Sequence, residues 1–144
     1  MIKTLTGLAT ALFLFSTVPA FAHDDIFSRA FEYIGLHERQ HKAKVQSITK
    51  VNPSRVPWCA AFVNGILSQT GRQGTGSNAA ASFAKYKSPT KTPKKGDIVV
   101  MRGHVGFFQS FVGKGRVAVL GGNQSNRVKI SAFSTRKVLS YRSV

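Results

Sequence analysis

Three residues of this chain have types and surroundings that suit nucleophilic catalysis. Cys59 opens a mostly apolar segment, His104 opens a run of β-branched and aromatic residues, and Asn123 lies in a glycine-rich loop. At a helix amino terminus, unpaired N–H groups and the helix dipole would favour the thiolate and hold an oxyanion. A histidine can accept the thiol proton, and an asparagine can orient the imidazole. Each residue alone would suggest a structural role, but together they predict a Cys-His-Asn triad that attacks a carbonyl carbon.

The elements that must position these residues follow from hydrophobic spacing and from helix breakers. Apolar residues at helical spacing predict a helix over 27–36, and a mostly apolar segment between Pro57 and Gly71 predicts a second, central helix. A short helix is expected over 79–86, whereas 42–56 is polar and irregular. Short β-branched or aromatic runs predict strands at 98–101, 104–112, 116–120, 127–130 and 137–141, with a hairpin turn at 113–115. Helices followed by a meandering antiparallel sheet indicate an α+β domain.

Four short motifs carry a resemblance to a known family. They are PWCAAFV at 57–63, KGDIVV at 95–100, GHVGF at 103–107 and GGNQS at 121–125. These motifs resemble those of the CHAP/NlpC-P60 superfamily, and more narrowly its small bacterial and phage branch with a WCAAFVN box and a GGNQ loop. The resemblance extends over nearly all of the chain after its first 30 residues or so. It implies a papain-like cysteine fold and cleavage of amide bonds in peptidoglycan.

The resemblance also assigns roles to individual residues. Cys59 matches the nucleophile, His104 the base and Asn123 the third residue of the triad. Further residues of the same motifs are expected near the oxyanion or the substrate, namely Trp58, Ala60, Gly103 and Gln124. The chain departs from the pattern at one point, because many members have a glutamate soon after the histidine, where this chain has Phe and Gln.

A motif at 37–41 suggests a different chemistry. The sequence His37-Glu38-Arg39-Gln40-His41 fits HExxH, which on a helix binds zinc through both histidines and uses the glutamate as base. No later glutamate exists as a third ligand, the extended pattern fails at Lys44 and Ser47, and Gly35 interrupts the helix just before the motif. His104 could in principle be the third ligand, so a zinc peptidase stays as an alternative. The preferred interpretation needs neither a metal nor another cofactor.

The first 22 residues are organised as a cleavable secretory signal peptide. Lys3 supplies a positive charge, residues 5–18 form an uncharged apolar run, and Ala20-Phe21-Ala22 fits the small-x-small cleavage site. The run is too short to span a bilayer comfortably, and no other segment is long and apolar enough. We therefore expect a mature chain of residues 23–144, folded as one domain without a transmembrane anchor, in the periplasm or outside the cell.

Charge and cysteine content narrow the function further. The chain has 21 Lys and Arg against 5 Asp and Glu, a net charge of +16, and the basic residues are spread out rather than gathered in a nucleic-acid-binding arm. Such a protein is attracted to anionic wall polymers. Its single cysteine excludes a disulfide within the chain.

The expected function is that of an exported cysteine amidase or endopeptidase acting on peptidoglycan. The alternatives are a non-catalytic wall- or polyanion-binding module on the same scaffold, and the zinc peptidase. The sequence leaves open which bond is cut, whether the wall is the cell's own, and whether an inhibitory partner exists.

Overall fold

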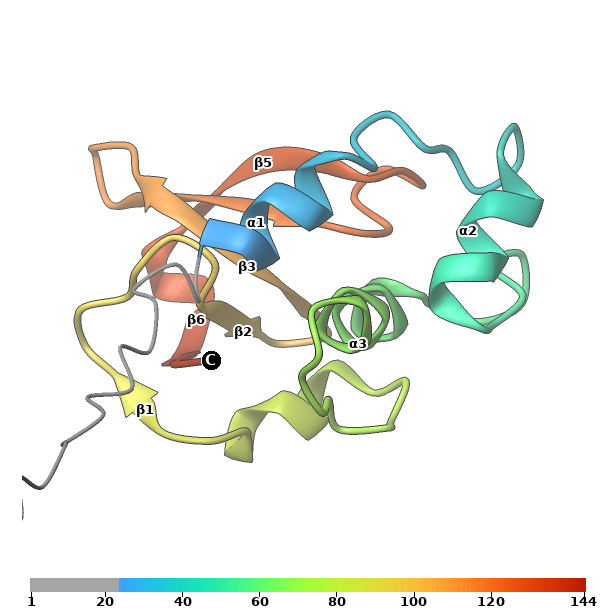
Figure 1. The fold of residues 1–144 in the computed structure, drawn as a ribbon. Helices are drawn as coiled ribbons and strands as arrows, with labels where there is room; N and C mark the ends of the chain where they lie inside the picture. The colour runs from blue at the N-terminus through green and yellow to red at the C-terminus, as the bar shows by residue number, and fades with distance from the viewer. Residues whose placement is uncertain (1–23) are drawn as a thin grey trace, which may run out of the picture.

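The computed structural model describes residues 24–144, so the predicted signal peptide lies outside the described residues. Three helices come first: α1 (Asp24–Phe31), α2 (Lys42–Thr49) and α3 (Cys59–Gln69), followed by a short 3₁₀ helix, η1 (Ala80–Lys85). The strands are β1 (Pro89–Thr90), β2 (Ile98–Met101), β3 (His104–Phe111), β4 (Arg116–Gly121), β5 (Lys129–Ser134) and β6 (Val138–Arg142), with a second 3₁₀ helix, η2 (Thr135–Lys137), before β6. Helices precede an antiparallel sheet, and the predicted α+β fold is confirmed (Figure 1).

The described strands form one six-stranded sheet in the order β1-β6-β2-β3-β4-β5, with every neighbouring pair antiparallel. Strands β2 to β5 form a meander, and β6 returns to pair with β2 on its free side. The turn between β3 and β4 has positive φ at Gly113, Lys114 and Gly115, as a tight hairpin requires. Met101 pairs with His104, so a two-residue turn places His104 at the end of the sheet.

Alternating residues of the sheet build two apolar clusters on its two faces. One face packs against the helices, where Trp58, Phe62 and Phe83 meet strand residues such as Val100 and Phe107. The other face carries a smaller cluster, made of Val99, Met101, Phe108, Val117 and Val119 with the partly buried Phe133, Val138 and Tyr141. Helix α3 lies at the centre of the helical layer, and its first residue, Cys59, lies against the sheet. No helix in residues 24–144 is long and apolar enough to cross a membrane.

Two helix predictions were wrong: one helix was missed, and another ends earlier than expected. Residues 42–49 form α2, although the segment looks irregular because Val45 and Ile48 are its only buried aliphatic side chains. Helix α1 ends at Phe31 rather than at residue 36, and turns continue to Gly35, which has a φ of +92° and donates its N–H to Val128. Both errors have one cause: the helices are short, and most of their stability comes from packing against α3 and the sheet rather than from local sequence.

The strand predictions erred at the edge of the sheet. The strand expected at 127–130 begins at Lys129, because Arg127 instead forms an isolated bridge with His37. The two-residue strand β1 was not predicted, since it consists of only Pro89 and Thr90.

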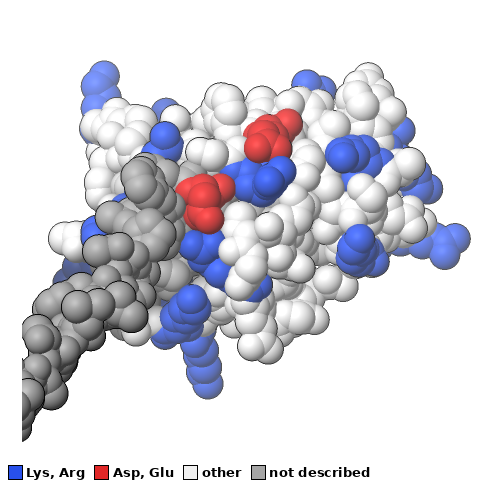
Figure 2. Space-filling model, in the orientation of Figure 1, with Lys and Arg blue, Asp and Glu red and all other residues white. Residues whose placement is uncertain are grey.

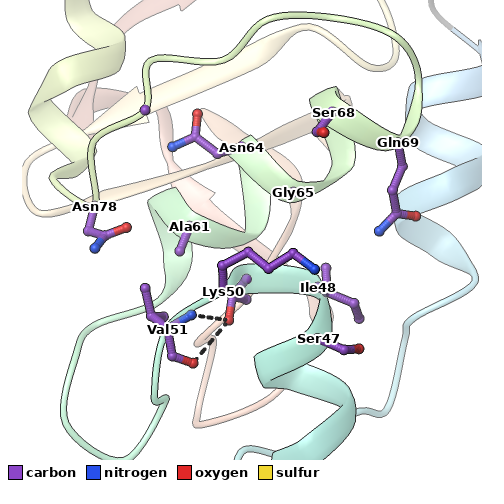
Figure 3. Close-up of a pocket in the computed structure, with 12 residues that line it drawn as sticks. Ser47, Ile48, Lys50, Val51, Ala61, Asn64, Gly65, Ser68, Gln69 and Asn78 are labelled. Atoms are coloured by element: carbon purple, nitrogen blue, oxygen red, sulfur yellow. Dashed lines mark hydrogen bonds between the residues drawn. The ribbon is translucent and has the colours of Figure 1, made fainter.

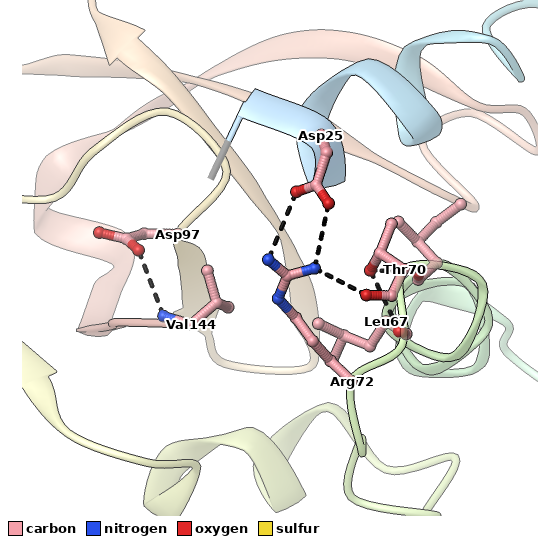
Figure 4. A network of polar contacts seen from close by, with 7 residues as sticks. Asp25, Leu67, Thr70, Arg72, Asp97 and Val144 are labelled. Carbon is pink, nitrogen blue, oxygen red and sulfur yellow. Dashed lines mark hydrogen bonds and ion pairs between the residues drawn. The ribbon is translucent and has the colours of Figure 1, made fainter. Parts of the chain in front are cut away.

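Two buried or half-buried polar groups hold the layers together (Figure 4). Arg72, just after α3, contacts both oxygens of Asp25 on α1 at 3.4 Å and donates to the Thr70 carbonyl at 2.9 Å. Asp97, in the KGDIVV motif, is 2% exposed and accepts the N–H groups of Lys94 at 2.8 Å and Val144 at 3.3 Å. The carboxylate of Asp97 thus ties the end of the chain to the start of β2, which is a structural role.

The close approach of α2 to α3 predicts the sign of one substitution. A Cβ at Gly65 would meet the carbonyl oxygen of Ile48 on α2, so Gly65→Ala should lower the free energy of unfolding by about 1–3 kcal/mol. In a free helix the same change would stabilise by about 1 kcal/mol. The exposed Ser68→Ala on the same helix should change it by less than about 0.5 kcal/mol. Urea unfolding measures both variants, and a more stable Gly65→Ala protein would contradict this helix contact.

Candidate active site

The Cys59 sulfur lies where helix α3 meets strand β3. Cys59 is the first residue of α3 and is 4% exposed. Backbone hydrogen bonds from Val105, Ala60 and Cys59 itself reach the thiol. Because Val105 follows His104 directly on β3, the sulfur lies against the backbone next to that histidine. The fold thus brings the nucleophile and the predicted base, 45 positions apart in the sequence, to one end of the sheet.

The pKa of the Cys59 thiol is affected more by burial than by its position at the start of helix α3. Loss of solvent raises the pKa of Cys59 above its ordinary value, and the three backbone N–H groups only partly offset this rise. The sequence had suggested the opposite, a pKa lowered into the reactive range, because the helix position is visible in the sequence and the burial is not. The resting residue is therefore a neutral thiol.

His104 is held by a side chain from the loop after β4. Its Nε2 lies 2.9 Å from Oε1 of Gln124, and its ring packs on Phe133 at 5.6 Å between centroids. Burial lowers the pKa of His104 below its ordinary value, and the bond to Gln124 raises it only in part. The imidazole is consequently neutral near pH 7, as a general base must be.

The hydrogen bonds of Gln124 fix which nitrogen of His104 carries the proton. Gln124 is 5% exposed, and its amide nitrogen donates to the carbonyls of Val119 at 3.2 Å and Lys129 at 2.7 Å. The amide oxygen must therefore face His104 and can only accept. Nε2 of His104 is then the donor, and Nδ1 keeps the free electron pair. Gln124 thereby selects the tautomer in which Nδ1 can act as a base.

The structure gives this orienting hydrogen bond to Gln124 rather than to Asn123, for which we expected it. Asn123 has a φ of +57° and is half-buried. It lines a hollow of about 260 Å³ together with His104, Gln124, Ser125, Ser131 and Phe133. The left-handed conformation of Asn123 turns the chain, and the next residue points inward. Asparagine is among the residues most often found in that conformation, so the Gly-Gly-Asn sequence was itself the signal for a turn.

Both glycines of the GGNQ loop are required by close contacts. A Cβ on Gly121 would lie 2.6 Å from Oε1 of Gln124 and 3.3 Å from Nε2 of His104. A Cβ on Gly122 would lie 2.7 Å from both the Trp58 ring and Cβ of Phe62. Gly121 therefore leaves room for the orienting hydrogen bond, and Gly122 lets the loop pack against the start of α3.

The other residues expected near the oxyanion or the substrate have separate roles in the structure. Trp58 is fully buried, and its indole N–H donates to Glu38 at 3.1 Å, so it is engaged in the core. Ala60 is buried and presents its N–H to the Cys59 sulfur. Gly103, with a φ of +72°, forms the exposed turn before His104. Of this group, Ala60 and Gln124 contact the catalytic candidates directly.

The HExxH segment does not have the geometry of a zinc-binding helix. Residues 37–41 form a bridge and a turn rather than a helix. Nδ1 of His41 accepts the His37 N–H at 3.0 Å, Nδ1 of His37 accepts the Arg39 N–H at 3.2 Å, and Glu38 is bonded to Trp58. Within residues 24–144, no three His, Cys, Asp or Glu side chains lie together as a metal site. The motif instead anchors the segment before α2.

A separate cavity of about 450 Å³ lies between α2 and α3 (Figure 3). It is lined by residues of both helices and of the loops that follow them. Its polar lining residues are uncharged except for one lysine: Ser47, Thr49, Lys50, Asn64, Ser68, Gln69 and Asn78. None of Cys59, His104 and Gln124 lines this cavity. The catalytic candidates are therefore separate from this cavity, and His104 borders the hollow of about 260 Å³ at the end of the sheet.

Comparison with known proteins identifies the family. The CHAP domain family model matches residues 51–123, just over half of the chain, and the match includes Cys59 and His104. The chain belongs to the CHAP domain family. CHAP domains are typically hydrolases of the amidase and peptidase kind, and the family points to peptidoglycan as the substrate. Gln124 lies one residue beyond the matched segment. No curated protein and no solved structure matched the chain.

The orienting hydrogen bond can be tested by comparing substitutions at the neighbouring residues Gln124 and Asn123. Gln124→Ala removes the acceptor for Nε2 of His104, so kcat/KM on a peptidoglycan fragment should fall by about ten- to a thousand-fold. Asn123→Gly keeps the left-handed turn and should stay within a few-fold of the wild-type rate. Circular dichroism and thermal unfolding would show whether both variants remain folded. A severe loss in Asn123→Gly beside an active Gln124→Ala would assign the role to Asn123.

The pKa directions predict how alkylation of Cys59 depends on pH. A raised thiol pKa keeps the thiolate fraction small at neutral pH, and a neutral His104 adds no positive charge to increase it. The rate of reaction with iodoacetamide should therefore rise steadily beyond pH 8 or so, later than for a free thiol such as glutathione. Because Cys59 is the only cysteine, intact-mass spectrometry follows it without ambiguity. A fast, level rate between about pH 5 and 8 would indicate a preformed thiolate–imidazolium pair.

Proposed function

We propose that this chain is an exported cysteine amidase or endopeptidase that hydrolyses amide bonds in peptidoglycan. The observation that carries the proposal is the placement of the Cys59 sulfur against Val105, next to a His104 that Gln124 holds as the correct tautomer. Family membership supports hydrolysis of an amide, and this arrangement supports cysteine as the nucleophile.

The geometry supports a two-step mechanism that starts from neutral groups. Nδ1 of His104 takes the proton of the Cys59 thiol while the sulfur attacks the amide carbonyl carbon. Backbone N–H groups at the start of α3 stabilise the oxyanion that forms. The imidazolium then gives its proton to the leaving amine, and a thioester with the acyl part of the substrate remains. Water, deprotonated by His104, hydrolyses the thioester and restores the thiol.

Throughout these steps the second nitrogen of His104 keeps its partner. Nε2–H donates to Gln124 in both the neutral and the charged imidazole, so the ring does not need to turn between proton transfers. Gln124 is itself fixed by Val119 and Lys129 on β4 and β5. This rigidity supports repeated use of one ring orientation, which general acid–base catalysis requires.

We also propose that the protein works outside the cytoplasm, bound to its substrate by surface charge. The signal-peptide pattern at 1–22 supports export. Figure 2 shows Lys and Arg side chains spread over the visible face, with few acidic ones among them. Positive charge dispersed in this way attracts an extended anionic wall polymer and does not form one localised binding site. Amino-terminal sequencing of protein from its native host should find His23 first, and an intact Met1 in extracytoplasmic material would contradict export.

Mass spectrometry of purified muropeptides, incubated with residues 23–144, tests the proposed reaction. The wild type should release fragments that differ by cleavage of one amide bond, and Cys59→Ala should release none while remaining folded. Iodoacetamide should abolish cleavage, whereas a chelator should not. The double variant His37→Ala, His41→Ala is the control. In the wild type each of these rings accepts a hydrogen bond from a backbone N–H group, so the rate of the variant should stay within a few-fold of the wild-type rate.

Two other results would point to the alternatives. Wall binding without cleavage by the wild type would indicate a non-catalytic module. Loss of activity in the double histidine variant, beside an active Cys59→Ala, would assign the chemistry to zinc.

A further inference from the structure

We propose that the substrate carries a free carboxylate on an acidic amino-acid residue next to the cleaved amide, and that Arg102, Arg136 and Lys137 bind this carboxylate. The inference rests on the proposed function, since it takes His104 as the catalytic base. It adds what the family does not specify, which is the chemical form of the substrate that this chain prefers.

The three basic residues line a hollow of about 510 Å³ that borders His104 directly. Arg102 comes from the turn between β2 and β3, whereas Arg136 and Lys137 belong to η2. The sheet brings these segments together, because Met101 pairs with His104 on one side and with Val138 on the other. A group bound in this hollow would therefore lie within a few side chains of the reacting amide.

The four acidic side chains that the structure describes have partners away from this hollow. Asp25 contacts Arg72, Glu32 pairs with Arg29, Glu38 accepts from Trp58, and Asp97 is buried beside Lys94 and Val144. None of these four carboxylates lines the hollow. Three neighbouring cations repel one another, and a bound anion would relieve this repulsion.

The remaining walls of the hollow are apolar and favour an amino acid with an aliphatic stem. Met101, Phe133 and Leu139 line it together with the basic residues, and Leu139 is 62% exposed. Methylene groups can pack on these side chains while the carboxylate meets the guanidinium groups, which bind carboxylates well. Because Phe133 also packs on His104, the bound residue would belong to the molecule being cut and not to a tethering polymer elsewhere on the surface.

The test uses two synthetic stem peptides that differ only at the acidic residue of the stem. One has the free carboxylate and the other the carboxamide. The wild type should cleave the carboxylate peptide with a kcat/KM about tenfold or more higher, chiefly through a lower KM. The triple variant Arg102→Gln, Arg136→Gln, Lys137→Gln should lose this preference and cleave the two peptides with similar kcat/KM.

A second triple variant controls for net charge. Arg39→Gln, Lys42→Gln, Arg55→Gln removes two arginines and one lysine from exposed positions outside the hollow and should keep the preference. Equal cleavage of both peptides by the wild type, or equal effects of the two triple variants, would overturn the proposal, the second result indicating general attraction to anionic polymer.

Failure of the proposed function would give a different pattern, in which the wild type cleaves neither peptide. Binding to the folded Cys59→Ala protein then decides the inference by itself, measured by calorimetry with the same two peptides. Tighter binding of the carboxylate peptide, lost in the hollow triple variant, supports the carboxylate site. Equal binding of the two peptides overturns it.

Discussion

The hydrogen bond from Nε2 of His104 to Gln124 is the interaction on which the rest of the site depends. It sets the tautomer of the ring, keeps the ring against Phe133, and leaves Nδ1 without a proton. Its geometry is in turn fixed by the sheet, because the Gln124 amide is bonded to carbonyls on both sides of the β4–β5 pair. Gly121 completes the arrangement by leaving space where any side chain would displace the amide oxygen.

A neutral orienting residue has an electrostatic consequence for the reaction. A carboxylate in place of Gln124 would stabilise the imidazolium and favour a preformed ion pair. An amide cannot do this to the same degree, and burial acts on both partners in the direction of neutrality. In the proposed mechanism, charge therefore develops only as the sulfur attacks, when the N–H groups at the start of α3 are already in place.

Much of this organisation could be predicted from sequence, and the failures have identifiable physical causes. Pro57, Gly71 and the apolar residues between them located α3, and strand alternation located His104 at the sheet end. Helix α2 was missed because only one face of a short segment is buried. The bonding partner of His104 was missed by one position, since Asn123 and Gln124 are both suitable acceptors and the choice depends on the backbone at Asn123. Burial of Cys59, which decides the direction of its pKa shift, is a property of the packed layers and of no local pattern.

The burial of Cys59 also affects how readily its sulfur is oxidised. Peroxides and disulfides react with thiolates far faster than with thiols, and oxidation beyond the sulfenic acid is irreversible for most proteins. A sulfur that is 4% exposed and protonated at rest is a poor target for such oxidants. The chain has no second cysteine to form a protective disulfide within the molecule. For the exported cysteine enzyme proposed above, a nucleophile that stays neutral until an amide binds would resist oxidation outside the cytoplasm, although its first proton transfer would be slower.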